Sequence, residues 1–263
     1  MVVSMDALRV EARYAPGDIL QLWKRNMLAY RRQPDLLVFS TIQPVMFVLL
    51  FAYVFGGAIQ TGPVDYIDFL LPGILAQSVL FGSTQTGVGL AVDVTSGMID
   101  RYRTLPMARS AVVAGRILAD TTRNVFVVGL MLGVGFLIGF RYHGTVAGAI
   151  AMPFVAVLFG QTFCWISAAI GTSVRRAETA QVASFVWLFP LVFVSSVFVP
   201  VETMPDWLEV VAENSPVTHT VNAMRGLALG TDFWEPLVKA LGWMAGIMAV
   251  FVPLAVWRYR SIQ

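Results

Sequence analysis

Three ionisable residues, Arg116, Asp120 and Arg123, follow one another at helical spacing where a long apolar run begins. Positions i, i+4 and i+7 share one face of a helix, so the two guanidinium groups can pair with the carboxylate between them. Ionisable groups inside a membrane segment commonly mark a functional site. They can also form a structural belt of ion pairs near the wet end of the segment, which is the interpretation we favour.

Other reactive residues are too few and too scattered to build a catalytic or metal site. Cys164 is the single cysteine, and the two histidines, His143 and His219, lie far apart, so no cluster has metal-ligand spacing. Neither lysine, Lys24 or Lys239, follows a glycine-rich loop or precedes Ser or Thr, which excludes a phosphate-binding P-loop. No G-x-S-x-G or H-E-x-x-H motif occurs. We therefore expect no catalysis, metal or cofactor in this chain, and any ATP-driven work to come from another polypeptide.

The composition is that of a membrane protein. Hydrophobic residues make up 57% of the 263 and charged residues only 13%, against about 25% charged in soluble domains. Several uncharged runs reach the ~20 residues that a helix needs to cross a bilayer. The net charge of +2 gives no indication of a nucleic-acid partner. The first 35 residues lack the apolar core of a cleavable signal peptide.

These runs predict an all-α polytopic protein with a single transmembrane domain over residues 1–263. The six predicted spans cover residues 36–59, 69–92, 110–140, 145–171, 179–199 and 237–257. Fifteen of the 18 Lys and Arg residues then fall on one side of the membrane. The positive-inside rule puts that side, with both termini, in the cytoplasm. We expect a multi-pass protein of the cell membrane.

The N-terminal segment predicts an amphipathic helix over residues 18–33, after a loose polar tail at 1–16 and with Asp18 as its N-cap. At 100° per residue its apolar and aromatic side chains share one face: Ile19, Leu22, Trp23, Met27 and Tyr30. Its basic side chains gather opposite: Lys24, Arg25, Arg31 and Arg32. That pattern favours a helix in the membrane interface, with Trp and Tyr at headgroup level. The alternative is a solvated basic flank.

Polar side chains inside the first two spans, Gln43, Gln77 and Gln85, are candidates for a translocation path. Gln77 and Gln85 lie two helical turns apart, so they can line one face of their span. Interhelical hydrogen bonding is the more common role of such residues in membranes, and we favour it for this pair.

The external segment 200–236 contains two short helical patterns, at 205–213 and 217–229, and the second stops at Gly230, a suitable C-terminal cap. Each is too short to cross the membrane. We interpret them as a re-entrant helical hairpin that dips into the outer leaflet, which is permitted where protein covers the loop backbone. An external loop with two surface helices is the alternative, because periodicity does not report depth.

Between the second and third spans lies a basic, proline-punctuated loop. A short helix starts at Ser96-Gly97 and runs to about Thr104, the chain breaks at Pro106, and a new helix starts at the N-cap Ser110. Such a compact helix between two spans can act as a mechanical lever. It can also be a plain connector, since basic cytoplasmic loops are the rule.

The spacing D-(3)-G-(2)-DR-(3)-LPM-(2)-R-(5)-GR-(3)-D, from Asp93 to Asp120, resembles the signature of type 2 ABC exporter permeases. The daunorubicin/doxorubicin-resistance branch is the most similar. Leu71-Pro72-Gly73 fits the same branch, and so does the external segment through five positions: Pro205, Trp207, Asn214, Pro216 and Arg225. The resemblance covers nearly the whole chain.

The resemblance implies a permease subunit that exports amphiphilic drugs, antibiotics or lipids. A separate nucleotide-binding ATPase subunit would bind ATP and Mg²⁺, and a second permease copy, identical or paralogous, would complete the path. A coupling helix at 94–105 and the interfacial helix would contact the ATPase, and spans 1, 2 and 5 would line the path. The implied coupling residues are Gly97, Asp100, Arg101, Arg103, Leu105, Pro106, Arg109, Lys24 and Arg25. The implied outer gate, in the hairpin, consists of Pro205, Trp207, Asn214 and Arg225.

Three alternatives remain. Relatives of this branch export polysaccharides or glycolipids with the same architecture, so the resemblance leaves the cargo open. A self-sufficient secondary transporter would need a titratable group at mid-membrane, where Asp120 is the only nearby acid and has two arginines beside it; the two halves of the chain also do not resemble each other. A membrane enzyme is disfavoured by the missing nucleophile, base and metal sets.

Overall fold

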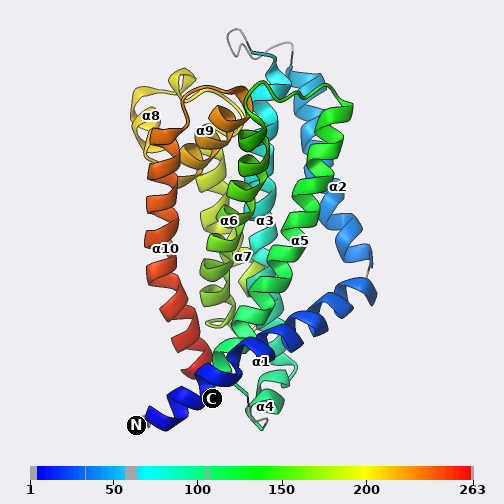
Figure 1. Ribbon diagram of the computed structural model, residues 1–263, viewed down its shortest axis with the longest axis vertical. Helices are drawn as coiled ribbons and strands as arrows, with labels where there is room; N and C mark the ends of the chain where they lie inside the picture. The colour runs from blue at the N-terminus through cyan, green and yellow to red at the C-terminus, as the bar shows by residue number, and fades with distance from the viewer. Residues whose placement is uncertain (1–4, 33, 57–63, 105–106, 262–263) are drawn as a thin grey trace.

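The computed structural model describes residues 5–32, 34–56, 64–104 and 107–261. Within these ranges every regular element is helical, and the elements pack into an elongated bundle (Figure 1). The long helices are α1 (Met5–Arg32), α3 (Tyr66–Thr95), α5 (Arg109–Leu137), α6 (Val146–Gly171) and α10 (Trp234–Ser261). The shorter helices are α2 (Pro34–Leu50), which continues as π-helix Phe51–Phe55, α4 (Met98–Arg103), α7 (Ala177–Phe193), the 3₁₀ turn Val201–Thr203, α8 (Asp206–Glu213) and α9 (Pro216–Leu229).

Four helices in the described part of the chain are long and apolar enough to cross a membrane: α3, α5, α6 and α10. Two shorter apolar helices, Thr41–Val54 and Ala177–Phe193, accompany them and correspond to the first and fifth predicted spans. The outward faces of these helices carry large exposed apolar side chains, as expected where lipid or another subunit replaces water.

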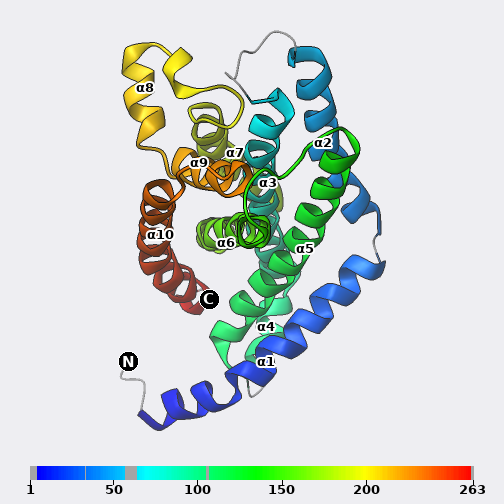
Figure 2. The ribbon, with the colours of Figure 1, turned by 45° about the horizontal axis from the view of Figure 1, so that its top comes forward.

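The helix α3 is the core of the bundle and is in contact with α2, α5, α6, α7 and α9. It packs especially closely on α6, which lies inside the ring of helices in Figure 2. Gly87 permits this approach, because a Cβ there would lie 2.4 Å from the Ser167 carbonyl oxygen. Gly171 faces the Gly87 carbonyl in the same way, at 2.1 Å. Small residues let membrane helices approach closely enough for extensive van der Waals contact.

The fifth predicted span ends earlier than the expected residue 199. Helix α7 stops at Phe193, and the following backbone is held by hydrogen bonds to another element: Ser196 N donates to Thr218 Oγ1 of α9 at 3.1 Å. Gly73 of α3 makes room for this non-helical segment, since a Cβ there would lie 2.2 Å from the Val197 carbonyl oxygen. Hydropathy detects the apolar run through Val199 but not these polar contacts.

Other boundaries also differ from the sequence predictions. Helix α1 begins by Met5, so residues 5–16 are helical and not a loose tail. The third span ends at Leu137 and not at 140, because the chain turns at Gly139 with φ 112°. Residues 94–95, predicted to start the coupling helix, belong to α3. The separate short helix of this segment is α4, Met98–Arg103.

The two ends of the bundle differ in construction. Helix α1 crosses the lower end obliquely in front of α4, and both chain ends lie at this end of the molecule (Figure 1). At the opposite end α9 is buried among α3, α6 and α10, and it is capped by Ser215 and by Gly230 in the left-handed region. Helix α8 lies beside it with Trp207 72% exposed.

The close packing of α3 on α6 predicts that Gly87→Ala destabilises the bundle by about 1–3 kcal/mol, the usual cost of overpacking. Gly133→Ala is the matched control, because Gly133 lies within the last two turns of α5 and a Cβ there meets nothing within 4 Å. Thermal unfolding in detergent should show a lower midpoint for the first variant and an unchanged or slightly higher midpoint for the second. Equal midpoints would contradict the packing argument.

Candidate functional site

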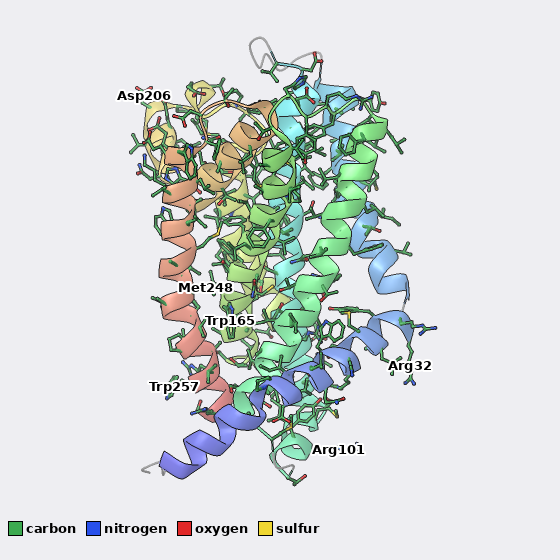
Figure 3. All side chains as sticks on the ribbon, in the orientation of Figure 1. Arg32, Arg101, Trp165, Asp206, Met248 and Trp257 are labelled. Carbon is green, nitrogen blue, oxygen red and sulfur yellow. The ribbon has the colours of Figure 1, made fainter. Side chains whose placement is uncertain are left out.

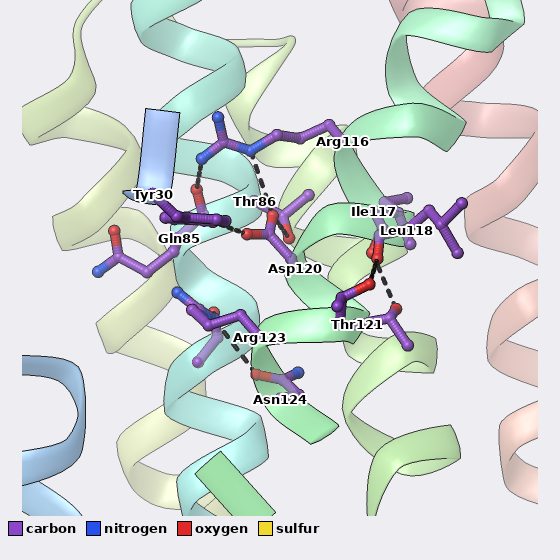
Figure 4. A network of polar contacts seen from close by, with 12 residues as sticks. Tyr30, Gln85, Thr86, Arg116, Ile117, Leu118, Asp120, Thr121, Arg123 and Asn124 are labelled. Atoms are coloured by element: carbon purple, nitrogen blue, oxygen red, sulfur yellow. Dashed lines mark hydrogen bonds and ion pairs between the residues drawn. The ribbon is translucent and has the colours of Figure 1, made fainter. Parts of the chain in front are cut away.

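The carboxylate of Asp120 joins the three helices α1, α3 and α5 through a network of polar contacts (Figure 4). Its side chain is fully buried, and both oxygens accept hydrogen bonds. Thr86 Oγ1 of α3 donates to Oδ2 at 2.7 Å, Arg116 Nε of α5 donates to the same oxygen at 3.2 Å, and the Tyr30 hydroxyl of α1 donates to Oδ1. A buried carboxylate with this many donors is satisfied and ionised.

The two arginines of the predicted charged triad behave differently. Arg116 pairs with Asp120 and also donates to the Gln85 carbonyl oxygen at 3.2 Å. Arg123 makes no ion pair with a described residue; it donates to the Gly82 carbonyl at 2.6 Å and to Asn124 Oδ1 at 3.3 Å. The triad therefore supplies one direct ion pair, between Arg116 and Asp120. Arg123 is a buried cation that lies within electrostatic range of Asp120 but makes no direct ion pair with a described residue.

Helix α1 is fastened to the rest of the bundle by polar contacts along its length. The Asp18 carboxylate accepts from the Ala108 backbone N–H at 2.9 Å, so it caps α5 and not its own helix. Trp23 Nε1 donates to Thr122 Oγ1 at 3.0 Å. The apolar face of the predicted interfacial helix thus packs on α5, where Gly115 allows the approach: a Cβ there would lie 2.7 Å from Leu22 Cβ.

Arg25 extends this set of contacts to α3 and α4. Its guanidinium lies 3.3 Å from the Asp93 carboxylate and also donates to the Tyr102 hydroxyl. Burial of the Tyr102 ring raises the pKa of that hydroxyl, which stays protonated in the contact. Of the two α1 residues predicted for coupling, Lys24 and Arg25, both are exposed, and Arg25 also makes these contacts within the chain.

The predicted coupling segment forms the lowest part of the bundle (Figure 3). Gly97 has φ +69°, a left-handed conformation that glycine adopts without strain, and it turns the chain from α3 into α4. Arg101 is exposed at this end. Leu105 and Pro106 lie outside the described residues, as do the side chains of three further predicted coupling residues: Asp100, Arg103 and Arg109.

The three glutamines predicted to line a path border one cavity of about 80 Å³ between α2, α3 and α5. Gln43 contributes from α2, and Gln77 and Gln85 from α3. Arg123 and Asn124 of α5 line the same cavity. The favoured interhelical hydrogen bond is absent at Gln77 Oε1, which is buried without a partner among the described residues.

The predicted outer gate residues are not gathered in one place. Arg225 is buried, donates to the carbonyls of Phe69 and Ser196 at 2.8 and 2.6 Å, and lies 3.4 Å from the Phe69 ring centroid. It therefore fixes the non-helical segment after α7 against α3. The other three are exposed on or next to α8: Pro205, Trp207 and Asn214.

Comparison with known proteins fits this arrangement. The sequence model of the ABC-2 type transporter family matches residues 17–229, which include the second part of α1, the coupling segment and α9. The chain belongs to the ABC-2 type transporter family.

Individual relatives align along most of this ABC-2 chain. A daunorubicin resistance ABC transporter permease protein, DrrB1 of Streptomyces coeruleorubidus, is 36% identical over 262 residues, 99% of this chain and 92% of that protein. A probable doxorubicin resistance ABC transporter permease protein, DrrC of Mycobacterium tuberculosis (strain ATCC 25618 / H37Rv), is 25% identical over 95% of this chain and 91% of that protein. With its long apolar helices, this family member is a multi-pass protein of the plasma membrane.

Several residues at the centre of this ABC-2 site were given other roles by sequence reasoning. Tyr30 was predicted as an interface anchor and Asp18 as a cap of its own helix, because local patterns do not report a partner about 90 residues away. Thr86 and Asn124 carried no signal beyond being polar residues in apolar runs.

Asp120→Asn is expected to destabilise the protein by about 3 kcal/mol, because it leaves buried guanidinium groups without a counter-charge. Glu235→Gln is the control: this residue forms an i,i+4 pair with Lys239 on the exposed surface, and its loss should have no measurable effect. Thermal unfolding of both variants in detergent tests the claim. An unchanged midpoint for Asp120→Asn would show that the carboxylate does not hold the three helices together.

Proposed function

We propose that this chain is the membrane permease subunit of an ATP-driven exporter of amphiphilic drugs or lipids. It would have six spans, both termini in the cytoplasm, a separate ATPase subunit as its source of energy and a second permease copy as its partner. Relatives with drug-resistance names and 92% or 91% coverage support the export of amphiphiles. Export of a glycolipid or polysaccharide is the second candidate, because the same architecture would serve it.

The observation that carries the proposal is the set of contacts from α1 to the other helices at the lower end of the bundle. Arg25 joins α1 to α3 and α4, Tyr30 joins it to α5, and Asp18 caps the start of α5. A force on α1 or α4 would therefore reach two long spans, α3 and α5, without an intervening flexible link. This is what a subunit that receives work from an ATPase requires.

A continuous row of phenylalanine rings supports an amphiphilic cargo. Successive ring centroids lie 4.5–6.0 Å apart from α2 to α7 and back to α3. The row contains Phe47, Phe51, Phe198, Phe193, Phe189 and Phe81. Its two ends, Phe47 and Phe81, also line the glutamine cavity. Aromatic faces beside a few polar groups suit molecules with an apolar body and a polar end. We place the path along α2, α3 and α7, the first, second and fifth spans.

A self-sufficient proton-coupled transporter fits the geometry less well. Such a protein needs a carboxylate that gains and loses a proton in the membrane. Asp120 accepts hydrogen bonds from Arg116 and from two hydroxyl groups, so protonation would weaken these contacts and leave Arg116 without its counter-charge. These contacts favour a static structural role.

The Asp100→Ala/Arg101→Ala double variant, which removes two charges from the middle of α4, should uncouple transport from ATP hydrolysis. ATP hydrolysis by the partner would continue, while export from reconstituted vesicles would fall by about tenfold. A factor of this size is typical of the coupling between two sites. The control, Asp206→Ala/Glu209→Ala, removes two charges from α8 at the opposite end and should leave export unchanged. Normal ATP-dependent export by the α4 variant would contradict the coupling role.

The six-span topology predicts opposite sides for α4 and α8. In a Cys164→Ala background, Asp206→Cys should react with a membrane-impermeant thiol reagent on intact cells. Arg103→Cys should react only after permeabilisation. Labelling of both positions on intact cells would contradict the predicted topology.

A further inference from the structure

Arg123 is a buried cation near the middle of a membrane-crossing helix. It lies halfway along α5 and is 5% exposed. Asp120 is the one acid of this cluster, and it already pairs with Arg116. The cluster of two arginines and one aspartate therefore carries a net charge of +1 away from water. A buried unpaired charge is costly in a membrane, and such residues usually meet a counter-charge.

Buried polar atoms of residues that line the glutamine cavity lack a hydrogen-bond partner among the described residues. Arg123 Nε is buried and has no hydrogen-bond partner among the described residues. On the α3 side of the cavity Gln77, 3% exposed, has an unpartnered Oε1. A glycine at position 82 makes room for the guanidinium, because a Cβ there would lie 3.0 Å from Arg123 Nη2. The cavity is thus bordered by buried polar atoms that no described residue satisfies.

A second hollow reaches Arg123 from the other side. It has a volume of about 300 Å³ and lies between α1 and α5, lined by Met27, Tyr30, Arg31, Thr122, Arg123 and Phe126. Arg31 is exposed at the end of the basic face of α1, whereas Met27 and Phe126 are apolar. Arg123 is common to both hollows, so a molecule that entered beside α1 would meet Arg31 first and Arg123 next.

We propose that Arg123 binds the anionic group, phosphate or carboxylate, of a membrane amphiphile whose apolar chain lies against Phe47 and Phe81 or in the hollow beside α1. A carboxylate or phosphate in the cavity can accept from the Arg123 guanidinium and neutralise the excess charge, and charge-assisted contacts of this kind are the strong ones. Calling this amphiphile the cargo rests on the proposed export function; the binding itself does not. A cationic amphiphile would be repelled from the site.

The test is binding to the purified full chain in detergent, without ATPase or nucleotide. The probe is dodecyl phosphate, measured by titration calorimetry, with competition by dodecyl trimethylammonium, dodecyl maltoside and inorganic phosphate. Arg123→Gln should weaken dodecyl phosphate binding by about tenfold or more, the factor expected for a lost charge-assisted hydrogen bond. Arg123→Lys should retain part of the affinity. Arg176→Gln, which removes an exposed arginine before α7, should retain all of it.

Equal binding by Arg123→Gln and the parent chain would overturn the proposal, and so would equal competition by the cationic amphiphile. If inorganic phosphate competed as well as dodecyl phosphate does, the site would bind a free anion, and the proposal of an amphiphilic ligand would be wrong. If Arg123→Gln fails to fold, Ser78→Leu replaces it, because this change fills the cavity without removing a charge. Undiminished binding of dodecyl phosphate by Ser78→Leu would show that this cavity is not the binding site. If the chain binds dodecyl phosphate through Arg123 but the complex exports no amphiphile, the proposed export function is wrong and the binding site stands.

Discussion

The buried carboxylate of Asp120 is the constraint on which the lower half of this protein depends. An ionised carboxylate is stable away from water only where donors replace its hydration. Here the donors come from three different helices: Tyr30 from α1, Thr86 from α3 and Arg116 from α5. Because each helix contributes a group that the carboxylate needs, none can separate from the others without exposing an unsatisfied charge. The amphipathic helix α1 is therefore part of the bundle and not a loose attachment to it.

The same charge balance explains why the middle of α5 differs from its beginning. Asp120 satisfies Arg116, and Arg123, one turn further along, is left with backbone and amide acceptors only. The first part of the charged face thus holds α1 in place, while the second part faces a cavity with three glutamines around it. The members of the triad therefore have different roles. Arg116 and Asp120 hold helices together, and Arg123 is the residue proposed to bind an anionic group.

Sequence reasoning succeeded where a signal was local and failed where a partner was distant. Apolar runs predicted α3, α5, α6 and α10 because membrane helices satisfy their own backbone. Gly230 ended α9 as expected from capping chemistry, while the N-cap Ser215 was not predicted. The early end of α7 could not be predicted, since it depends on Arg225 and Thr218 approaching from α9. Helical spacing grouped Gln77 with Gln85, but only tertiary packing brought Gln43 and Arg123 to the same cavity.

The central claim is that α1 and the lower half of α5 move as one body. Its most direct test is a spin-label distance measurement between Leu20→Cys on α1 and Leu118→Cys on α5 in the reconstituted complex with its ATPase. Both side chains are exposed, so labels should be tolerated. The account predicts the same distance with and without ATP, while a reference pair, Leu20→Cys and Val210→Cys on α8, changes. A change in the α1–α5 distance beyond the ~1–2 Å adjustment of packed helices would contradict it.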